Sequence, residues 1–208
     1  MCIRDSFGAQ AHDIISAPST RKAFDLEQEK PAESKRFGKH EFGQSLLLAA
    51  RLIEAGVHFV TVRLRPAEFD FDTHTDNFSR LRALLPPFDQ GLAALIDRLK
   101  ERGLFGETAL MVAGEFGRTP KINAQGGRDH WARAMFALMA GGDVQGGQVI
   151  GATDDRASEP TGTGYSPEDL AATFFQNIGI NPQHEFQTNV GRPINLIRDG
   201  RPIEQLFS

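Results

Sequence analysis

The feature that most constrains the fold is a row of apolar residues at helical spacing in the middle of the chain. These residues follow one another at steps of three or four: Phe78, Leu81, Leu85, Phe88, Leu92, Leu95 and Leu99. The spacing lays them along one face of a long helix. Because proline lacks a backbone donor and clashes with the preceding turn, Pro86 and Pro87 should kink this helix or divide it in two.

Short apolar segments around this helix predict strands. Residues 57–62 and 108–114 are short and rich in β-branched or other apolar side chains, as is typical of buried strands, and residues 134–140 are a third candidate. His58 is then expected to lie in the core or on a sheet face. The order strand, helix, strand predicts a parallel sheet. The fold class is therefore α/β, with a mainly parallel sheet flanked by helices.

Two further helices are predicted from their ends. Apolar residues recur at helical spacing in residues 41–55, and Gly56 follows where a helix stop is expected. Ser166 and Asp169 supply the N-cap and the acidic third position of a helix reaching about residue 178. Residues 146–151 suggest a short edge strand or hairpin before a loop at residues 152–164.

Length and composition indicate one globular domain. The chain has 208 residues, of which 40% are hydrophobic and 24% charged. Residues 7–40 are polar and predict an irregular or partly helical lead-in, and residues 41–208 predict the domain itself. Residues 1–6 fit neither part, so we expect a spurious leader and a chain that is the carboxy-terminal part of a longer protein.

The net charge, the length of the apolar segments and the cysteine count exclude several kinds of binding partner. The formal net charge is -4 and no basic stripe is present, so nucleic acid is not expected as a partner. No apolar run approaches the roughly 20 residues that cross a bilayer, so membrane insertion is not expected. The single cysteine, Cys2, excludes a cysteine-based zinc site. No feature of the sequence fixes an oligomeric state.

Three loops next to the predicted strands carry side chains suited to a divalent metal ion. In parallel sheets, ligands bind beyond the carboxyl ends of the strands. The first loop holds Asp72 and His74, which would point the same way on an extended backbone. Glu115 follows the second strand directly, and Asp129 and His130 lie in the third loop. Carboxylates and imidazoles suit zinc, manganese or similar ions.

Two arginines accompany these candidate ligands. Arg118 lies in the second loop and Arg128 in the third. Guanidinium groups bind planar or tetrahedral oxyanions, and their pairing with metal ligands favours hydrolysis of phosphate or sulfate esters. The alternative is that both arginines only pair with Glu115 and Asp129 in a structural network.

Other assignments stay open at this stage. Asp70 and Asp76 flank Asp72 and either could replace it as a ligand, although Asp76 is equally placed to cap the helix that follows. Trp131 could wall off the site, but packing alone explains it equally well.

Several segments together resemble one known family. They occur in one order along the chain: residues 42–57, 72–78 (Asp-Thr-His-Thr-Asp-Asn-Phe), 85–90 (Leu-Pro-Pro-Phe-Asp-Gln), 114–120 (Gly-Glu-Phe-Gly-Arg-Thr-Pro), 127–131 (Gly-Arg-Asp-His-Trp) and 191–194 (Gly-Arg-Pro-Ile). This series resembles the domain-of-unknown-function 1501 family, from about Phe24 to near Leu206. That family is placed in the alkaline phosphatase and sulfatase superfamily.

The resemblance implies an alkaline-phosphatase-like core that binds about two divalent ions. It implies Asp72, His74, Glu115 and His130 as candidate ligands, with Asp129 as a ligand or as the partner of one. Superfamily members usually have an Asp-His pair where this chain has Glu115 and Phe116, so the number and geometry of the metal ions are expected to differ.

The family also has an amino-terminal half with the first metal-binding Asp and the nucleophile position, and neither is identifiable in this sequence. We therefore expect the chain to be an inactive part of a hydrolase of phosphate or sulfate esters. Family members often carry an export signal, which implies that the full-length protein is periplasmic or extracellular.

Two other functions compete with the hydrolase. The departure at Glu115 and Phe116, together with the missing nucleophile, motivates a non-catalytic metal- or anion-binding module on the same scaffold. The third hypothesis is a structural domain in which the charged side chains pair only with one another.

Overall fold

The computed structural model describes residues 8, 12, 16–63, 71–162 and 164–208, which fall into two compact units. The helical unit comprises residues 1–72 and 78–102, and the strand unit comprises residues 73–77 and 103–208. The short segment 73–77 therefore packs with residues that are far from it in the sequence. The expected leader at residues 1–6 and the alternative ligand Asp70 lie outside the described residues.

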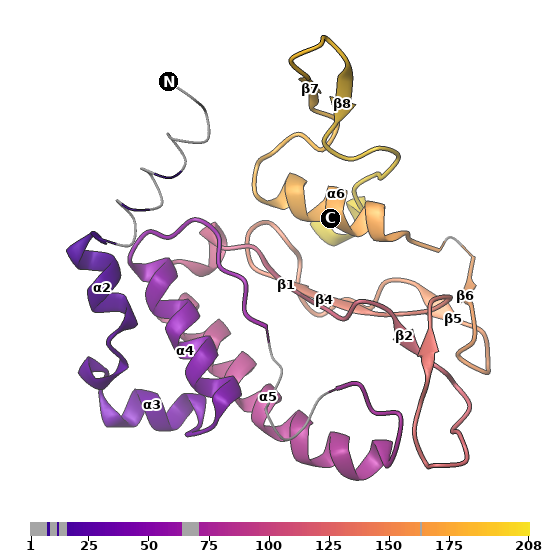
Figure 1. Cartoon of the computed structure of the whole chain (residues 1–208), viewed down its shortest axis with the longest axis horizontal. Coiled ribbons are helices and arrows are strands. Elements are labelled where there is room, and N and C mark those ends of the chain that lie inside the picture. Colours follow the sequence, from indigo (N-terminus) through magenta and orange to yellow (C-terminus); the bar gives the residue numbers. More distant parts are fainter. Residues whose placement is uncertain (1–7, 9–11, 13–15, 64–70, 163) are drawn as a thin grey trace. The chain divides into compact units, whose positions relative to one another are not determined.

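The regular structure of the helical unit consists almost entirely of α-helices (Figure 1). Its elements are α2 (Pro18–Phe24), the 3-10 helix η1 (Leu26–Gln28), α3 (Pro31–Phe37), α4 (Glu41–Glu54) and α5 (Asn77–Glu101). Helices α2 and α3 both contact α4, and Phe37, Leu47 and Leu99 are fully buried between the elements. The helix at residues 41–55 is thus confirmed, and residues 18–37 of the expected lead-in form α2, η1 and α3.

Local residue choice explains how α4 ends and how it packs. The chain leaves the helix through Gly56, whose φ of 88° lies in the left-handed region that glycine adopts at little cost. Gly91 of α5 faces α4, where an added methyl group would lie 3.0 Å from Cδ1 of Leu46 and 3.3 Å from Cα of Gly43. The absence of side chains at Gly43 and Gly91 lets the two helices approach closely.

Helix α5 runs undivided from Asn77 to Glu101 with Pro86 and Pro87 inside it, so of the two expected outcomes, a kink or a division, the division did not occur. A proline removes the hydrogen bond of its own nitrogen, and its ring crowds the carbonyl of the preceding turn. The buried side chains of Leu84, on one side of the prolines, and Leu95, on the other, hold both halves on the same core. Burial of about 1.5–3 kcal/mol per large apolar side chain offsets the lost bonds.

An ionic network joins α4 and α5. The Arg98 side chain is 3% exposed, and its guanidinium donates to Glu54 at 2.6 Å and approaches Glu29 at 3.1 Å. The hydrogen bond to Glu54 raises the pKa of Arg98 above its usual range. Burial alone would lower this pKa, but its effect is smaller. Arg51 of α4 donates to Glu29 at 2.8 Å and to the carbonyl of Ala23 at 2.8 Å. The network therefore also fixes the lead-in against both helices.

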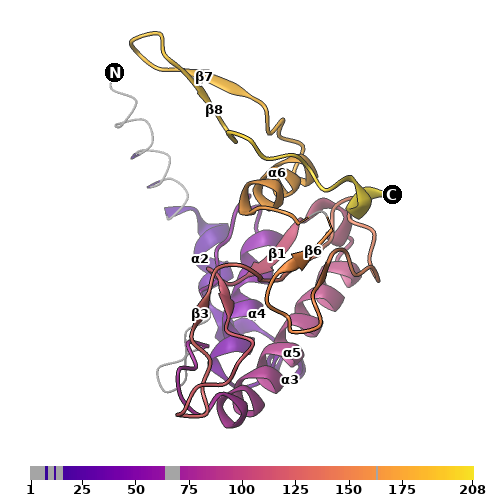
Figure 2. The same cartoon turned by 90° about the vertical axis from the view of Figure 1, so that its right-hand side faces the viewer.

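The strand unit is built from two-stranded antiparallel pairs. The pairs are β1 (Leu110–Ala113) with β4 (Ala137–Ala140), β2 (Gly117–Arg118) with β3 (His130–Trp131), β5 (Ala152–Thr153) with β6 (Pro160–Thr161), and β7 (Glu185–Gln187) with β8 (Pro193–Asn195). The 3-10 helices η2 (Phe105–Glu107) and η3 (Glu204–Phe207) and the helix α6 (Pro167–Asn177) complete it. The hairpin of β7 and β8 projects from α6 and is exposed along both strands (Figure 2).

The class of mixed helices and strands is as expected, but the described residues do not form the predicted mainly parallel sheet. Strands β1 and β4 were predicted, and they pair antiparallel, with Leu110 opposite Ala140. A parallel return needs a crossover, usually a helix. The connection at residues 114–136 contains β2 and β3 but no helix, so the chain returns in the opposite direction.

The predicted strand at residues 57–62 is also wrong. No strand is assigned to this described segment, Phe59 is 67% exposed, and His58 is exposed rather than in a core. An apolar, β-branched segment becomes a strand only where a neighbouring strand pairs with it. Residues 146–151 likewise form no strand, since the short hairpin begins one residue later, at Ala152.

Helix α6 confirms the helix that was predicted from the N-cap signals Ser166 and Asp169. The Ser166 side chain accepts from the amide of Asp169, and the Asp169 carboxylate accepts from the amide of Ser166, which completes a capping box. The same carboxylate accepts from the amide of Arg201 at 2.8 Å and so ties the carboxy-terminal segment to the start of α6. Within the described residues, no helix is both long and apolar enough to cross a membrane.

Candidate metal centre

The first candidate loop is held in place by backbone pairing within the strand unit. Hydrogen bonds join residues 73–77 to the third loop: Arg128 N to Thr73 O (2.9 Å), Asp76 N to Gln125 O (3.2 Å) and Asn77 N to Gly126 O (3.0 Å). Both Thr73 and Asn77 are buried, and the Thr73 hydroxyl donates to the side-chain oxygen of Asn77 at 2.6 Å. The segment is therefore anchored on both sides of His74.

Gly127 allows this close approach. A methyl group at position 127 would overlap the carbonyl group of His74. Gly127 is buried, and its own amide donates to the Asn123 side chain at 2.9 Å, so the loop has no room to move away. Of the pair Gly126-Gly127, the second residue must be glycine because the His74 carbonyl packs against it.

The second and third loops meet through the β2–β3 pair. Arg118 lies opposite His130, and Gly117 lies opposite Trp131. A side chain at Gly117 would overlap the carbonyl of Ala134, so glycine is needed there as well. The ring of Phe116 lies 4.2 Å from the His130 ring, centroid to centroid, and covers one side of it.

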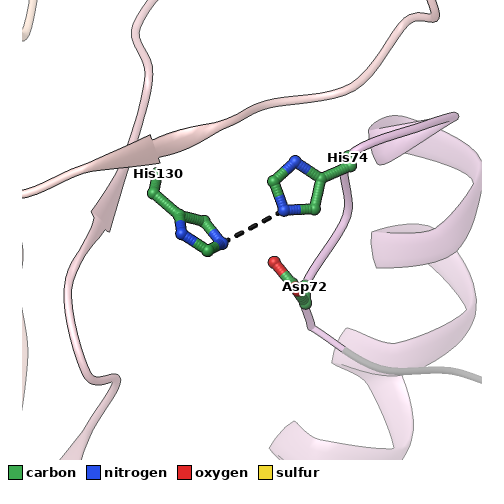
Figure 3. A group of neighbouring side chains, drawn as sticks. All are labelled: Asp72, His74 and His130. Carbon is green, nitrogen blue, oxygen red and sulfur yellow. Dashed lines mark hydrogen bonds between the residues drawn. The ribbon is translucent and has the colours of Figure 1, made fainter.

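His74 and His130, 56 residues apart in the sequence, face each other through their Nε2 atoms at 3.1 Å (Figure 3). The other ring nitrogen of His74, Nδ1, lies 2.8 Å from a carboxylate oxygen of Asp129. The hydrogen bond from His74 lowers the pKa of Asp129, so this carboxylate is ionised and acts as an acceptor. The Nδ1 atom then donates to Asp129, and Nε2 is the ring nitrogen that faces His130.

Asp72 adds an oxygen to the two imidazoles. It lies two positions before His74 in the chain. A carboxylate oxygen of Asp72 and one nitrogen each of His74 and His130 all lie within 4.8 Å of one another, and all three side chains are exposed. In Figure 3 the Asp72 oxygen points toward the facing nitrogens of the two rings.

This donor set fits a zinc-like ion. With Zn–N bonds of about 2.0–2.1 Å, two nitrogens of a tetrahedral site lie about 3.3 Å apart, close to the 3.1 Å between the imidazoles. The bond from His74 to Asp129 is the carboxylate–histidine arrangement that commonly orients a metal-binding imidazole. Two nitrogens and one carboxylate oxygen are typical of zinc, and an added water would complete four ligands.

The remaining sequence candidates lie differently. Glu115 is exposed in the turn between β1 and β2 and is not part of the group of three. Arg128 donates through Nη1 to the carbonyls of Thr119 at 2.6 Å and Pro120 at 2.8 Å, so one of its nitrogens is committed to the loop backbone. The Arg118 guanidinium carbon lies 5.7 Å from the centroid of the Phe116 ring.

Trp131 has a packing role in the structure. Its indole nitrogen donates to the carbonyl of Ser158 at 2.7 Å, which joins β3 to the loop between β5 and β6. Arg133 lies over the indole ring at 5.6 Å and forms an ion pair with Glu159 of the same loop.

The sequence reasoning missed Asn123. Its side-chain nitrogen lies 3.0 Å from the carbonyl oxygen of His74 and 3.2 Å from a carboxylate oxygen of Asp129. Its side-chain oxygen accepts from the amides of Gln125 at 3.0 Å and Gly127 at 2.9 Å. An Asn shortly before a Gly-Gly pair is a turn signal, because its side chain bonds to the backbone just beyond it. That signal could have indicated the loop but not its contact with His74.

Comparisons with known proteins assign the chain to a family. Residues 3–207 match the family described as "Protein of unknown function (DUF1501)". No curated protein and no solved structure matches the chain. The family match spans nearly the whole sequence and includes the loops that carry Asp72, His74, Asp129 and His130. The chain therefore belongs to the DUF1501 family.

Proposed function

We propose that this chain binds a divalent transition-metal ion, with zinc or manganese as the ions that suit its donors, through Asp72, His74 and His130. The observation that carries the proposal is the 3.1 Å separation of the two Nε2 atoms, with Nδ1 of His74 bonded to Asp129. Two imidazoles with facing nitrogens are stabilised by a cation between them. Asp129 strengthens the site because it fixes the orientation of the His74 ring.

The proposed reaction class is the metal-dependent hydrolysis of phosphate or sulfate esters. Three protein ligands leave a coordination position open, which is typical of catalytic rather than structural zinc sites. A bound ion would polarise the ester or activate water. The resemblance to the domain-of-unknown-function 1501 family, which is placed in the alkaline phosphatase and sulfatase superfamily, supports this class and a site for about two ions. Arg118 and Arg128 are the candidate groups for neutralising the substrate anion.

A non-catalytic metal-binding module is the second candidate. Two observations favour it: Nη1 of Arg128 is used by the backbone carbonyls of Thr119 and Pro120, and Glu115 is not part of the group of three. Such a module would share the metal site and lack turnover.

Zinc titration of the purified chain by calorimetry tests the metal site. We expect binding to the unchanged protein and a loss of affinity of at least about 100-fold in His74→Ala and His130→Ala, because each removes a ligand. His184→Ala is the matched control, since it removes an exposed histidine from the β7 end of the same unit. Equal binding by all four proteins would reject the site.

Turnover separates the two candidate functions. Under the hydrolase proposal, protein loaded with zinc or manganese should hydrolyse aryl phosphate or aryl sulfate esters, and a chelator should abolish the reaction until the metal is restored. Retention of metal without turnover of either ester would favour the binding module.

A further inference from the structure

Asn123 connects the two parts of the proposed metal centre. One of its side-chain atoms donates to the His74 carbonyl and to Asp129, the residue that orients the His74 ring. The other accepts from amides of its own loop, at Gln125 and Gly127. The side chain therefore uses both of its donors and both lone pairs of its oxygen within one small volume.

These contacts place His74 in two independent ways. The bond to the His74 carbonyl fixes the backbone of residues 73–77, and the bond to Asp129 fixes the acceptor for Nδ1 of the ring. The loop bonds keep Asn123 itself in one orientation and shape the turn that pairs with Asp76 and Asn77. A change at Asn123 should thus alter both the docking of the segment and the direction of the imidazole.

We infer that Asn123 is the positioning residue of the metal centre, and that it couples metal binding to the docking of residues 73–77 on the loop at residues 123–128. The inference rests on the proposed metal site and deepens it. Metal bound at His74 and His130 would join residues 73–77 to β3, which follows the loop of Asn123 directly, so each interaction would stabilise the other. Metal binding should therefore increase the order of residues 73–77, and loss of the metal should decrease it.

Asn123→Asp tests the donor contacts of Asn123 separately from its acceptor contacts. The carboxylate keeps the acceptor for Gln125 and Gly127, but it loses the donors to His74 and Asp129 and sets a second negative charge beside Asp129. Gln125→Ala is the control in the same loop, because Gln125 contacts Asp76 and Asn123 through its backbone. His130→Ala is the complementary variant, since it removes a metal ligand and leaves every Asn123 contact in place.

The experiment combines zinc titration with amide hydrogen exchange at Asp76, Asn77 and Arg128, whose amides bond across the two segments. In the unchanged protein we expect zinc to slow exchange at these amides at least about tenfold. In Asn123→Asp we expect faster exchange without zinc and about 10- to 100-fold weaker zinc binding. In His130→Ala we expect unchanged exchange without zinc and no slowing when zinc is added.

The outcomes distinguish the proposed metal site from the positioning role of Asn123. If the unchanged protein binds no zinc, the proposed metal site and this inference both fall. If it binds zinc but Asn123→Asp matches Gln125→Ala in affinity and exchange, the site stands and the inference alone is overturned. Should Asn123→Asp fail to fold, Asn123→Ser tests the same point, since its hydroxyl can accept from the loop amides but is shorter. Unaltered zinc affinity and exchange in that variant would again overturn the inference.

Discussion

The Nδ1 atom of His74 lies 2.8 Å from a carboxylate oxygen of Asp129, and this bond decides which nitrogen of the ring is available to a metal ion. Asp129 accepts from Nδ1, so Nε2 is the nitrogen that faces the Nε2 atom of His130, at 3.1 Å. The loops that carry these residues are 55 positions apart in the sequence and are brought together by backbone pairing around His74.

Removal of the Asp129 carboxylate should weaken metal binding without unfolding the protein. We expect Asp129→Ala to lower zinc affinity about 10- to 100-fold, because the His74 ring loses the group that orients it. The Asp129 side chain is 52% exposed, so the melting temperature without zinc should hardly change. Asp155→Ala, another exposed acid of the strand unit, is the control and should bind zinc normally. A normal affinity in Asp129→Ala would contradict the orienting role.

A side chain at Gly127 should push His74 away from the loop. We expect Gly127→Ala to lower the free energy of unfolding by about 1–3 kcal/mol, as overpacking in a close-packed site does, and to reduce zinc affinity. Urea denaturation and zinc titration measure the two effects. Gly146→Ala is the matched control because nothing lies within 4 Å of a methyl group there. Equal behaviour of the two variants would show that the contact with His74 is not tight.

Loss of Arg98 should strongly destabilise the helical unit. We expect Arg98→Ala to cost about 3–5 kcal/mol of unfolding free energy, because the partly buried carboxylates of Glu29 and Glu54 lose their shared partner. Asp97→Ala, one position earlier, removes a side chain that is 59% exposed and should cost at most about 1 kcal/mol. Chemical denaturation of both variants gives the comparison, and similar costs would argue against the network.

The pH dependence of stability should reveal Asp169. Hydrogen bonds from the amide of Arg201 and from Ser166 hold the pKa of this carboxyl below its usual value. The folded state thus favours the ionised form, and the resulting stability is present above the unfolded pKa of about 3.9 and is lost as pH falls through the lower folded value. Asp169→Asn should therefore lower the melting temperature clearly at pH 7 and much less near pH 3.

The neighbouring variant Glu168→Gln provides the reference for this measurement, since Glu168 is exposed in the same first turn. Its melting temperature should follow that of the unchanged protein at both pH values. A deficit in Asp169→Asn that stays constant from pH 7 to pH 3 would mean that the charge of Asp169 contributes nothing.

Features determined by neighbouring residues were predictable from the sequence. The capping box of Ser166 and Asp169 and the glycine after α4 are signals read within a few residues, and both formed as expected. The strand expected at residues 57–62 failed because strand formation depends on a distant partner, and pattern alone does not supply one. The same limit applies to the direction of pairing of β1 and β4.

The site was partly predictable for a related reason. His74 and His130 were singled out by residue type and by their places in loops, and the structure brings them together. The contribution of Asn123 depends on how the loop folds back on His74, and no local pattern carries that information. Glu115 was chosen because it follows a strand, but it lies outside the group of three.

Crystallographic anomalous scattering at the zinc edge, on protein crystallised with zinc, tests the central claim most directly. We expect a peak about 2.0–2.1 Å from Nε2 of both His74 and His130, with a carboxylate oxygen of Asp72 at about 2.0–2.2 Å. Asp129 should remain bonded to Nδ1 of His74 and not contact the ion. A zinc peak located elsewhere on the chain, or no peak in protein saturated with zinc, would contradict the account.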